Sequence, residues 1–135
     1  MQTFLPYKDF DLSAKCLDNK RLGNQRGETK TLLNSLLKNG GWSKHPAAKM
    51  WKGHEGALCL YGIIICKEWI RRGFIDNMLR FFESLYPSLP HTLPPWLGND
   101  KFHSAHKSNL LRKKPDWYQQ YKWNENNDLP YFWPV

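Results

Sequence analysis

The sequence has few cysteines, no long apolar run and no segment in which apolar and polar residues alternate. Its three cysteines, Cys16, Cys59 and Cys66, include no Cys-x-x-Cys pair, which argues against a disulfide framework or a thiolate zinc site. No apolar run reaches about 18 residues, so no segment is expected to cross a membrane. The first residues lack a basic stretch followed by an apolar one, so no secretory signal is expected. We therefore expect a cytoplasmic protein, in a bacterium or in an infected host cell.

Acidic residues are scarce: 12 Asp and Glu stand against 20 Lys and Arg, giving a net charge of +8. The excess is spread as +3 over residues 1–39, +3 over residues 40–90 and +2 over residues 91–135. A distributed excess indicates a basic face built from several elements, for which nucleic acid is the leading partner. The alternative is a basic protein that binds no polyanion. The length of 135 residues predicts one domain, residues 1–135, which we expect to be monomeric.

The fold class follows from the missing strand pattern and from clear helix boundaries. Asn39-Gly40-Gly41 should end the first helix, Pro46 should open the second, and Gly73 should follow its end. The expected segments are an extended stretch over residues 1–10 and helices over residues 11–38, 46–71, 75–85 and 101–113. Residues 57–66 are apolar nearly all round and predict the most buried element. The sequence thus predicts a compact all-α domain of about three main helices, with long ordered loops and an extended N-terminus.

A polar stretch interrupts the first helix. Between residues 18 and 31 the only large apolar residue is Leu22, yet Gln25 and Arg26 fall within the same inward arc. Polar groups on a core-facing arc are costly unless they are paired or functional. Gly23 and Gly27 have no side chains, so another backbone or a ligand can approach this side of the helix closely. This pattern predicts a functional site, although a solvated helix face would look similar.

Two glutamates are candidates for proton transfer. Glu55 lies along the buried helix, where loss of water contact would raise its pKa toward neutrality. A water-exposed glutamate at a helix start, stabilised by the helix dipole, is the alternative. Glu28 shares a helix face with Arg21 and Gln25, and its alternative is an ordinary surface ion pair.

His103 and His106 are three residues apart on a predicted helix, a spacing that can hold a metal ion. Neither His-Glu-x-x-His nor a cysteine partner accompanies them, so we expect no metal and no cofactor. The simpler interpretation places both histidines on a phosphate-facing side with Ser108 and Arg112. Residues 113–123 then interleave four aromatic rings with three lysines, which suits phosphate neutralisation and base stacking. A packed C-terminal tail is the alternative.

These pieces resemble the phage endonuclease V family of pyrimidine-dimer DNA glycosylases. The resemblance rests on Lys-Pro-Asp-Trp-Tyr-Gln-Gln-Tyr, on Gly53-His54 with the following apolar helix, and on Arg26. A bacterial and phage branch sharing MQTFLPY, LDNKRLGNQR, HPAAKMW and HKSNLLRK is more similar still. The resemblance implies a small all-α protein whose N-terminal α-amine attacks the sugar C1′, displaces the base and forms a Schiff base. A nearby glutamate would assist proton transfer.

The chain departs from that family at two positions. Gln2 disfavours removal of Met1, so the resemblance makes the amine of Met1 the nucleophile. The position of the family's glutamate is held by Leu22-Gly23, so Glu28 or Glu55 would replace it. The resemblance therefore implies Met1, Arg26, Glu28 and Glu55 as catalytic residues.

The expected substrate is double-stranded DNA with a damaged or modified pyrimidine. The expected DNA-binding residues are Arg21, Gln25, Lys52, His54, His103, His106, Ser108, Arg112, Lys114, Trp117, Tyr118 and Tyr121. Two other functions stay open at this point: a non-catalytic DNA-binding or base-modification accessory protein, and a histidine-metal nuclease.

Overall fold

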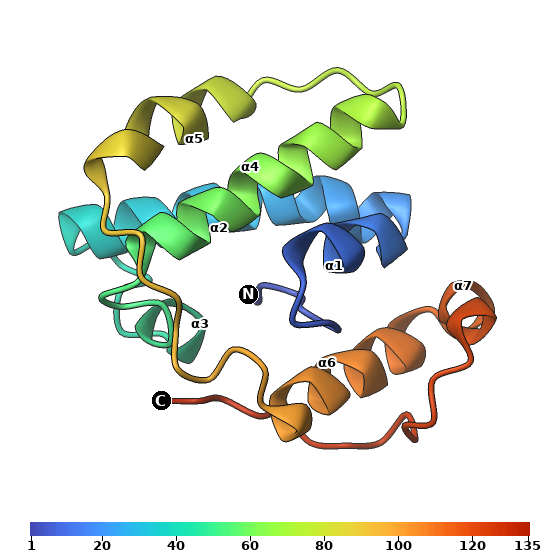
Figure 1. The fold of residues 1–135 in the computed structure, drawn as a ribbon. Helices are drawn as coiled ribbons and strands as arrows, with labels where there is room; N and C mark the ends of the chain where they lie inside the picture. The colour runs from blue at the N-terminus through green and yellow to red at the C-terminus, as the bar shows by residue number, and fades with distance from the viewer.

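A computed structural model describes all of residues 1–135 and contains helices but no strand, which confirms the all-α prediction (Figure 1). The helices are α1 (Phe10–Cys16), α2 (Asn19–Lys38), α3 (Pro46–Lys49), α4 (Glu55–Arg71), α5 (Leu79–Leu85), α6 (Asp100–Lys113) and α7 (Pro115–Tyr118), with 3₁₀ turns at Tyr86–Ser88 and Gln119–Tyr121. The three longest helices are α2, α4 and α6. Their ends at Lys38, Arg71 and Lys113 agree with the predicted stops.

The prediction of one helix over residues 11–38 was wrong, because the chain breaks at Leu17 and Asp18. Both residues have extended backbone angles, with ψ of 139° and 159°. The Asp18 N–H donates to the Tyr118 hydroxyl at 3.0 Å, and that hydroxyl donates to the Asp18 carboxylate at 2.5 Å. A contact with the far end of the chain thus fixes a break that local sequence does not mark.

The predicted helix over residues 46–71 is also broken, between α3 and α4. Gly53 adopts a φ of +85°, a left-handed conformation that a helix cannot contain. Trp51 lies within this break and is fully buried in the core. Its indole nitrogen donates to the Thr3 hydroxyl at 3.0 Å. The segment after α4 is shorter than predicted, because residues 75–78 form a loop before α5.

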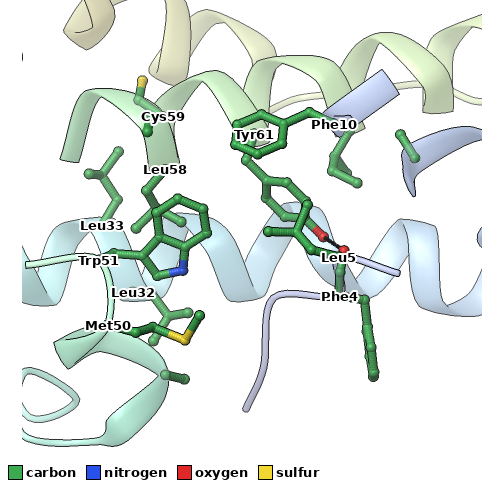
Figure 2. Packing of buried hydrophobic residues seen from close by; sticks show 14 of the residues in the cluster. Phe4, Leu5, Phe10, Leu32, Leu33, Met50, Trp51, Leu58, Cys59 and Tyr61 are labelled. Atoms are coloured by element: carbon green, nitrogen blue, oxygen red, sulfur yellow. Dashed lines mark hydrogen bonds between the residues drawn. The ribbon is translucent and has the colours of Figure 1, made fainter. Parts of the chain in front are cut away.

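The core forms where α4 packs on α2, α1 and α5. As predicted, the stretch over residues 57–66 is almost entirely buried. Figure 2 shows Leu58 and Tyr61 of α4 on the side of Trp51 and the leucines of α2, whereas Cys59 points away from them. None of the helices combines the length and apolar character needed to cross a membrane.

The cysteines are free and buried, as expected for small apolar residues. Burial raises the pKa of the Cys16 thiol to about 12 and that of Cys59 to about 11. Both side chains are therefore neutral thiols at physiological pH.

Candidate active site

The N-terminal segment, residues 1–6, is extended as predicted, but it lies inside the molecule. In Figure 1 it enters between the α2–α4 pair and α6, and residues 2–6 are buried. An extended segment without a sheet partner leaves its backbone N–H and C=O groups unpaired, and burial then requires other partners. Side chains of three helices supply those partners.

Gln25 of α2 and Tyr61 of α4 hold the first part of this segment. The Gln25 side-chain oxygen accepts from the Phe4 N–H at 3.0 Å, and its amide nitrogen donates to the Gln2 carbonyl at 2.8 Å. The Tyr61 hydroxyl lies 2.8 Å from the Phe4 carbonyl oxygen and 2.7 Å from the Gln25 oxygen. Figure 2 shows the contact between Tyr61 and Phe4 as a dashed line.

His103 and His106 of α6 hold the next residue, so their predicted place on a phosphate-facing surface was wrong. The Leu5 N–H donates to His106 Nδ1 at 2.8 Å, and the Leu5 carbonyl contacts His103 Nδ1 at 2.8 Å. Both histidines are buried. Burial, together with neighbouring His103, lowers the pKa of His106 to about 3, so the ring stays neutral. Their spacing serves the packing of the N-terminal segment.

The same Gln25 amide joins the N-terminal segment to Glu28. Its nitrogen donates to a Glu28 carboxylate oxygen at 2.7 Å, one helical turn further along α2. Burial raises the pKa of Glu28, while the N-terminal amine and Lys113 act in the opposite direction. The carboxyl group is therefore partly dehydrated and within the electrostatic influence of the N-terminal amine, an arrangement suited to proton transfer.

Met1 and Glu28 line a pocket of about 410 Å³, within the size range of small-molecule sites. Its lining residues are Met1, Gln2, Phe4, Lys20, Arg21, Asn24, Gln25, Glu28, His45, Lys113, Tyr131 and Trp133. Lys20, Arg21, Lys113 and the chain terminus share this lining with one carboxylate, so basic groups outnumber acidic ones and an anion is favoured. We call this the N-terminal pocket.

A second hollow of about 450 Å³ adjoins it on the glycine flank of α2. Its lining residues are Met1, Gly23, Asn24, Gly27, Glu28, Thr31 and Met78. The two hollows share Met1, Asn24 and Glu28, so they are neighbours at the chain terminus. The absent side chain at Gly27 leaves room there, because a Cβ at this position would come no closer than 3.9 Å to Met78.

The structure does not place Arg26 in either hollow, contrary to the prediction. Its guanidinium pairs with Asp76 at 2.7 Å and lies over the Trp69 ring, 4.7 Å from the centroid. Asp76 also accepts from the N–H groups of Met78 and Leu79 at the start of α5. The Arg26 side chain extends from α2 toward α4 and the loop before α5. Its ion pair with Asp76 therefore joins that loop to α2.

Glu55 is also outside the pocket. It begins α4, where its Oε1 accepts from the Gly53 N–H at 3.1 Å. Its second oxygen is buried without a hydrogen-bond partner. Glu55 thus lies at a helix start, as one alternative predicted, but its carboxyl group is not fully open to water as that alternative also required.

The predicted DNA-binding residues separate into two groups. Arg21 and Gln25 line the N-terminal pocket. The others lie outside it: Lys52, His54, His103, His106, Ser108, Arg112, Lys114, Trp117, Tyr118 and Tyr121. Ser108 and Tyr118 are fully buried, so their predicted contact with DNA was wrong. Ser108 accepts from the Leu129 N–H at 3.0 Å, while Tyr118 fixes the break before α2.

The rings of the Lys-Pro-Asp-Trp-Tyr-Gln-Gln-Tyr motif pack internally as well. The Trp117 indole donates to the Cys16 carbonyl at 2.8 Å, and Tyr121 stacks on Trp123 at 5.5 Å between ring centroids. Arg112 donates to the Asn127 carbonyl at 2.8 Å and so holds the C-terminal tail. The motif is thus mainly a packing element that joins α7 to α1 and α2.

Several pocket residues were missed from the sequence. Lys20 and Asn24 lie on α2 within the polar stretch, and that stretch was a usable signal for them. Lys113, His45, Tyr131 and Trp133 come from distant parts of the chain, and no spacing rule links them to α2. No group of three or more His, Cys, Asp and Glu side chains is arranged to hold a metal ion.

Comparison with curated proteins finds matrix metalloproteinase-23 of Bos taurus and of Homo sapiens, each 34% identical over 65 residues. The match covers 48% of this chain but only 16% of each relative, so the chain spans about a sixth of their length. No solved structure matches the chain.

The family match includes the whole N-terminal segment, all of α2 and α4 and the start of α5, but not the pocket residues Lys113, Tyr131 and Trp133. The model of the pyrimidine dimer DNA glycosylase family matches residues 1–81, more than half of the chain. The protein therefore belongs to the pyrimidine dimer DNA glycosylase family.

Proposed function

We propose that this protein excises a damaged or modified pyrimidine from double-stranded DNA and cleaves the resulting abasic site through a Schiff base on the Met1 amine. One observation carries the proposal: the chain terminus and the partly dehydrated carboxyl group of Glu28 line the same basic pocket. Membership of a DNA glycosylase family supports a DNA substrate. The amine and the carboxyl group supply the nucleophile and the proton carrier that such a reaction needs.

The first step replaces the base by the amine. The neutral amine of Met1 attacks C1′, the bond from C1′ to the base nitrogen breaks, and its electron pair leaves with the base, which takes up a proton. The nitrogen then loses a proton, and Glu28 in its acid form protonates O4′ as the C1′–O4′ bond breaks. The product is an open-chain sugar joined to Met1 as an iminium ion.

The second step cleaves the strand. The Glu28 carboxylate, now deprotonated, removes a proton from C2′, and the electron pair expels the 3′ phosphate oxygen from C3′. Water then hydrolyses the imine and frees the amine. Burial raises the pKa of Glu28, which favours the acid form that the first step needs, and release of that proton gives the carboxylate that the second step needs.

Phosphate binding falls to the basic side chains around the pocket. Lys20, Arg21 and Lys113 line it, and Arg21 is partly neutralised by Asp18 at 3.2 Å. DNA must be bent or opened for a nucleotide to reach such a hollow, and extrusion of the target nucleotide is the usual solution.

Borohydride trapping on duplex DNA with a single abasic site tests the proposal. The wild-type protein should form a covalent complex, and peptide mapping should place the adduct on Met1. Glu28→Gln should slow strand cleavage by about 100-fold or more, because general acid–base catalysis typically contributes 10²–10⁴-fold. The matched control Glu55→Gln should cleave at the wild-type rate, since Glu55 lies outside the pocket.

An uncleaved extension before Met1 should abolish trapping and leave DNA binding largely intact. An adduct on a lysine side chain, or full activity with the extended terminus, would contradict the mechanism. DNA binding without any trapping would favour a non-catalytic DNA-binding function, which the Leu22-Gly23 replacement in α2 also fits.

A further inference from the structure

Two aromatic rings from the C-terminal tail form one wall of the N-terminal pocket. Tyr131 and Trp133 both line it, and their rings stack with centroids 5.8 Å apart and an interplanar angle of 12°. The tail reaches this position after the last helical turn, at Gln119–Tyr121. In Figure 1 it runs beneath α6 and ends near α3.

The wall is fixed from two sides. On the α6 side, the Leu129 N–H donates to Ser108, and Arg112 lies over the Tyr131 ring, 5.9 Å from its centroid. On the other side, His45 packs edge-on against Trp133 at 5.8 Å between ring centroids. These contacts hold the rings in place and cover part of their surface, while both residues still line the pocket.

The rings are held open to the pocket, unlike the core aromatics. Tyr131 keeps 47% of its surface exposed, and Trp133 is partly buried. Partly exposed aromatic rings beside cationic side chains are what proteins present to unpaired bases. The aromatic motif around α7 cannot serve this purpose, because Tyr118 is fully buried and the Trp117 indole is bonded to the Cys16 carbonyl.

We propose that Tyr131 and Trp133 stack on the nucleobase extruded into the N-terminal pocket, and so recognise a base rather than the sugar and phosphates. This inference rests on the proposed function. The phosphates would lie on Lys20, Arg21 and Lys113, and the sugar beside Met1 and Glu28. Because the wall acts through ring faces, it requires a flat base but no particular pattern of hydrogen bonds.

The test compares two kinds of short duplex that differ at one position. One kind carries a base, either thymine in a thymine–thymine mismatch or a thymine dimer made by ultraviolet light. The other carries a tetrahydrofuran abasic analogue, which has no base and cannot be cleaved. Dissociation constants are measured by fluorescence anisotropy for the wild type, Tyr131→Ala, Trp133→Ala and the conservative Trp133→Phe. Tyr86→Ala is the control, because that ring stacks on His91 outside the pocket.

The alanine variants should bind at least one base-carrying duplex about tenfold more weakly, within the range measured for base–aromatic stacking. They should bind the abasic duplex as the wild type does and still form the borohydride-trapped complex. Trp133→Phe should restore most of the lost affinity. Equal loss on all duplexes, or no selective loss on either base-carrying duplex, would overturn the inference.

Failure of the proposed function gives a different result. If the wild type forms no trapped complex on abasic DNA, the Schiff-base mechanism fails. The ratio of the dissociation constants for the base-carrying and abasic duplexes still tests whether Tyr131 and Trp133 stack on a base. A melting temperature measured for each variant identifies loss of fold, and Trp133→Phe provides a folded comparison.

Discussion

Gln25 shows how much one buried side chain can organise. Its amide has two acceptor and two donor positions, and the structure uses all four, with Phe4, Tyr61, Gln2 and Glu28. A buried amide is tolerated only when it is paired in this way. Gln25 therefore connects the core to the pocket: it fixes the path of the N-terminal segment and the orientation of the Glu28 carboxyl group.

The raised pKa of Glu28 predicts how strand cleavage depends on pH. The carboxylate must be ionised to remove the C2′ proton, and burial moves its pKa above the ordinary value of 4.5. Cleavage of preformed abasic DNA should therefore fall as pH decreases through that raised pKa. Measured from about pH 4 to 7, the wild-type rate should show this acid limb. Glu28→Gln should lack it, and an unchanged limb in this variant would assign the titration to another group.

At the scale of an element, the N-terminal segment behaves as a strand whose neighbours are helices. Trp51, Tyr61, His103 and His106 bond to its backbone or to its Thr3 side chain. Two of these groups are titratable histidines that the fold keeps neutral. The anchoring of the segment should therefore depend on pH.

Acid should destabilise the fold through His106. Burial lowers the pKa of His106 from 6.5 to about 3. Between these two pH values the imidazole is protonated in the unfolded state and neutral in the folded state. This difference does not affect the free energy of unfolding above pH 6.5. As pH falls from 6.5 toward 3, it lowers the free energy of unfolding by up to ~1.4 kcal/mol per pH unit. Denaturant unfolding at pH 7.5 and pH 5 measures this loss. His106→Asn, which keeps an acceptor for Leu5, should show a smaller loss, and His91→Asn should match the wild type.

Gly23 and Gly27 of α2 should respond in opposite ways to alanine. A Cβ at Gly23 would lie 2.9 Å from the Trp69 ring. That ring is fixed by stacking on Phe74 and by its hydrogen bond to the Ile75 carbonyl, so Gly23→Ala should lower the melting temperature. At Gly27 there is room, and Gly27→Ala should stabilise by up to ~1 kcal/mol through helix propensity. Equal changes in melting temperature for Gly23→Ala and Gly27→Ala would show that the Trp69 ring can move away from a Cβ at position 23.

For the whole molecule, the net charge of +8 and its even spread predict binding that depends on many phosphate contacts. Affinity for duplex DNA should fall by roughly 10³–10⁵-fold between about 50 and 200 mM salt if 6–10 phosphates are contacted. Lys113→Ala should weaken binding and reduce the salt slope by about one contact, because Lys113 lines the pocket. Lys38→Ala, at the end of α2, should change binding much less. An affinity independent of salt would contradict a phosphate-dominated interface.

The sequence alone determined the elements whose information is local. Helical periodicity and the absence of alternation gave the fold class, and Asn39-Gly40-Gly41 and Gly73 marked helix ends because they act within one turn. The polar stretch on α2 predicted a site because polar groups facing a core need partners, and Gln25 was assigned to the site by that rule.

Only the tertiary structure decided which partners those groups have. Periodicity put Arg26 and Gln25 on one arc, yet Arg26 reaches Asp76 whereas Gln25 reaches the N-terminal segment. The break at Asp18 depends on Tyr118, and the pocket depends on Lys113, Tyr131 and Trp133. These contacts join residues far apart in the chain, so no local pattern encodes them. The contacts of Gln25 form because a buried extended segment must have its backbone groups paired, and the fold brings the necessary side chains around it.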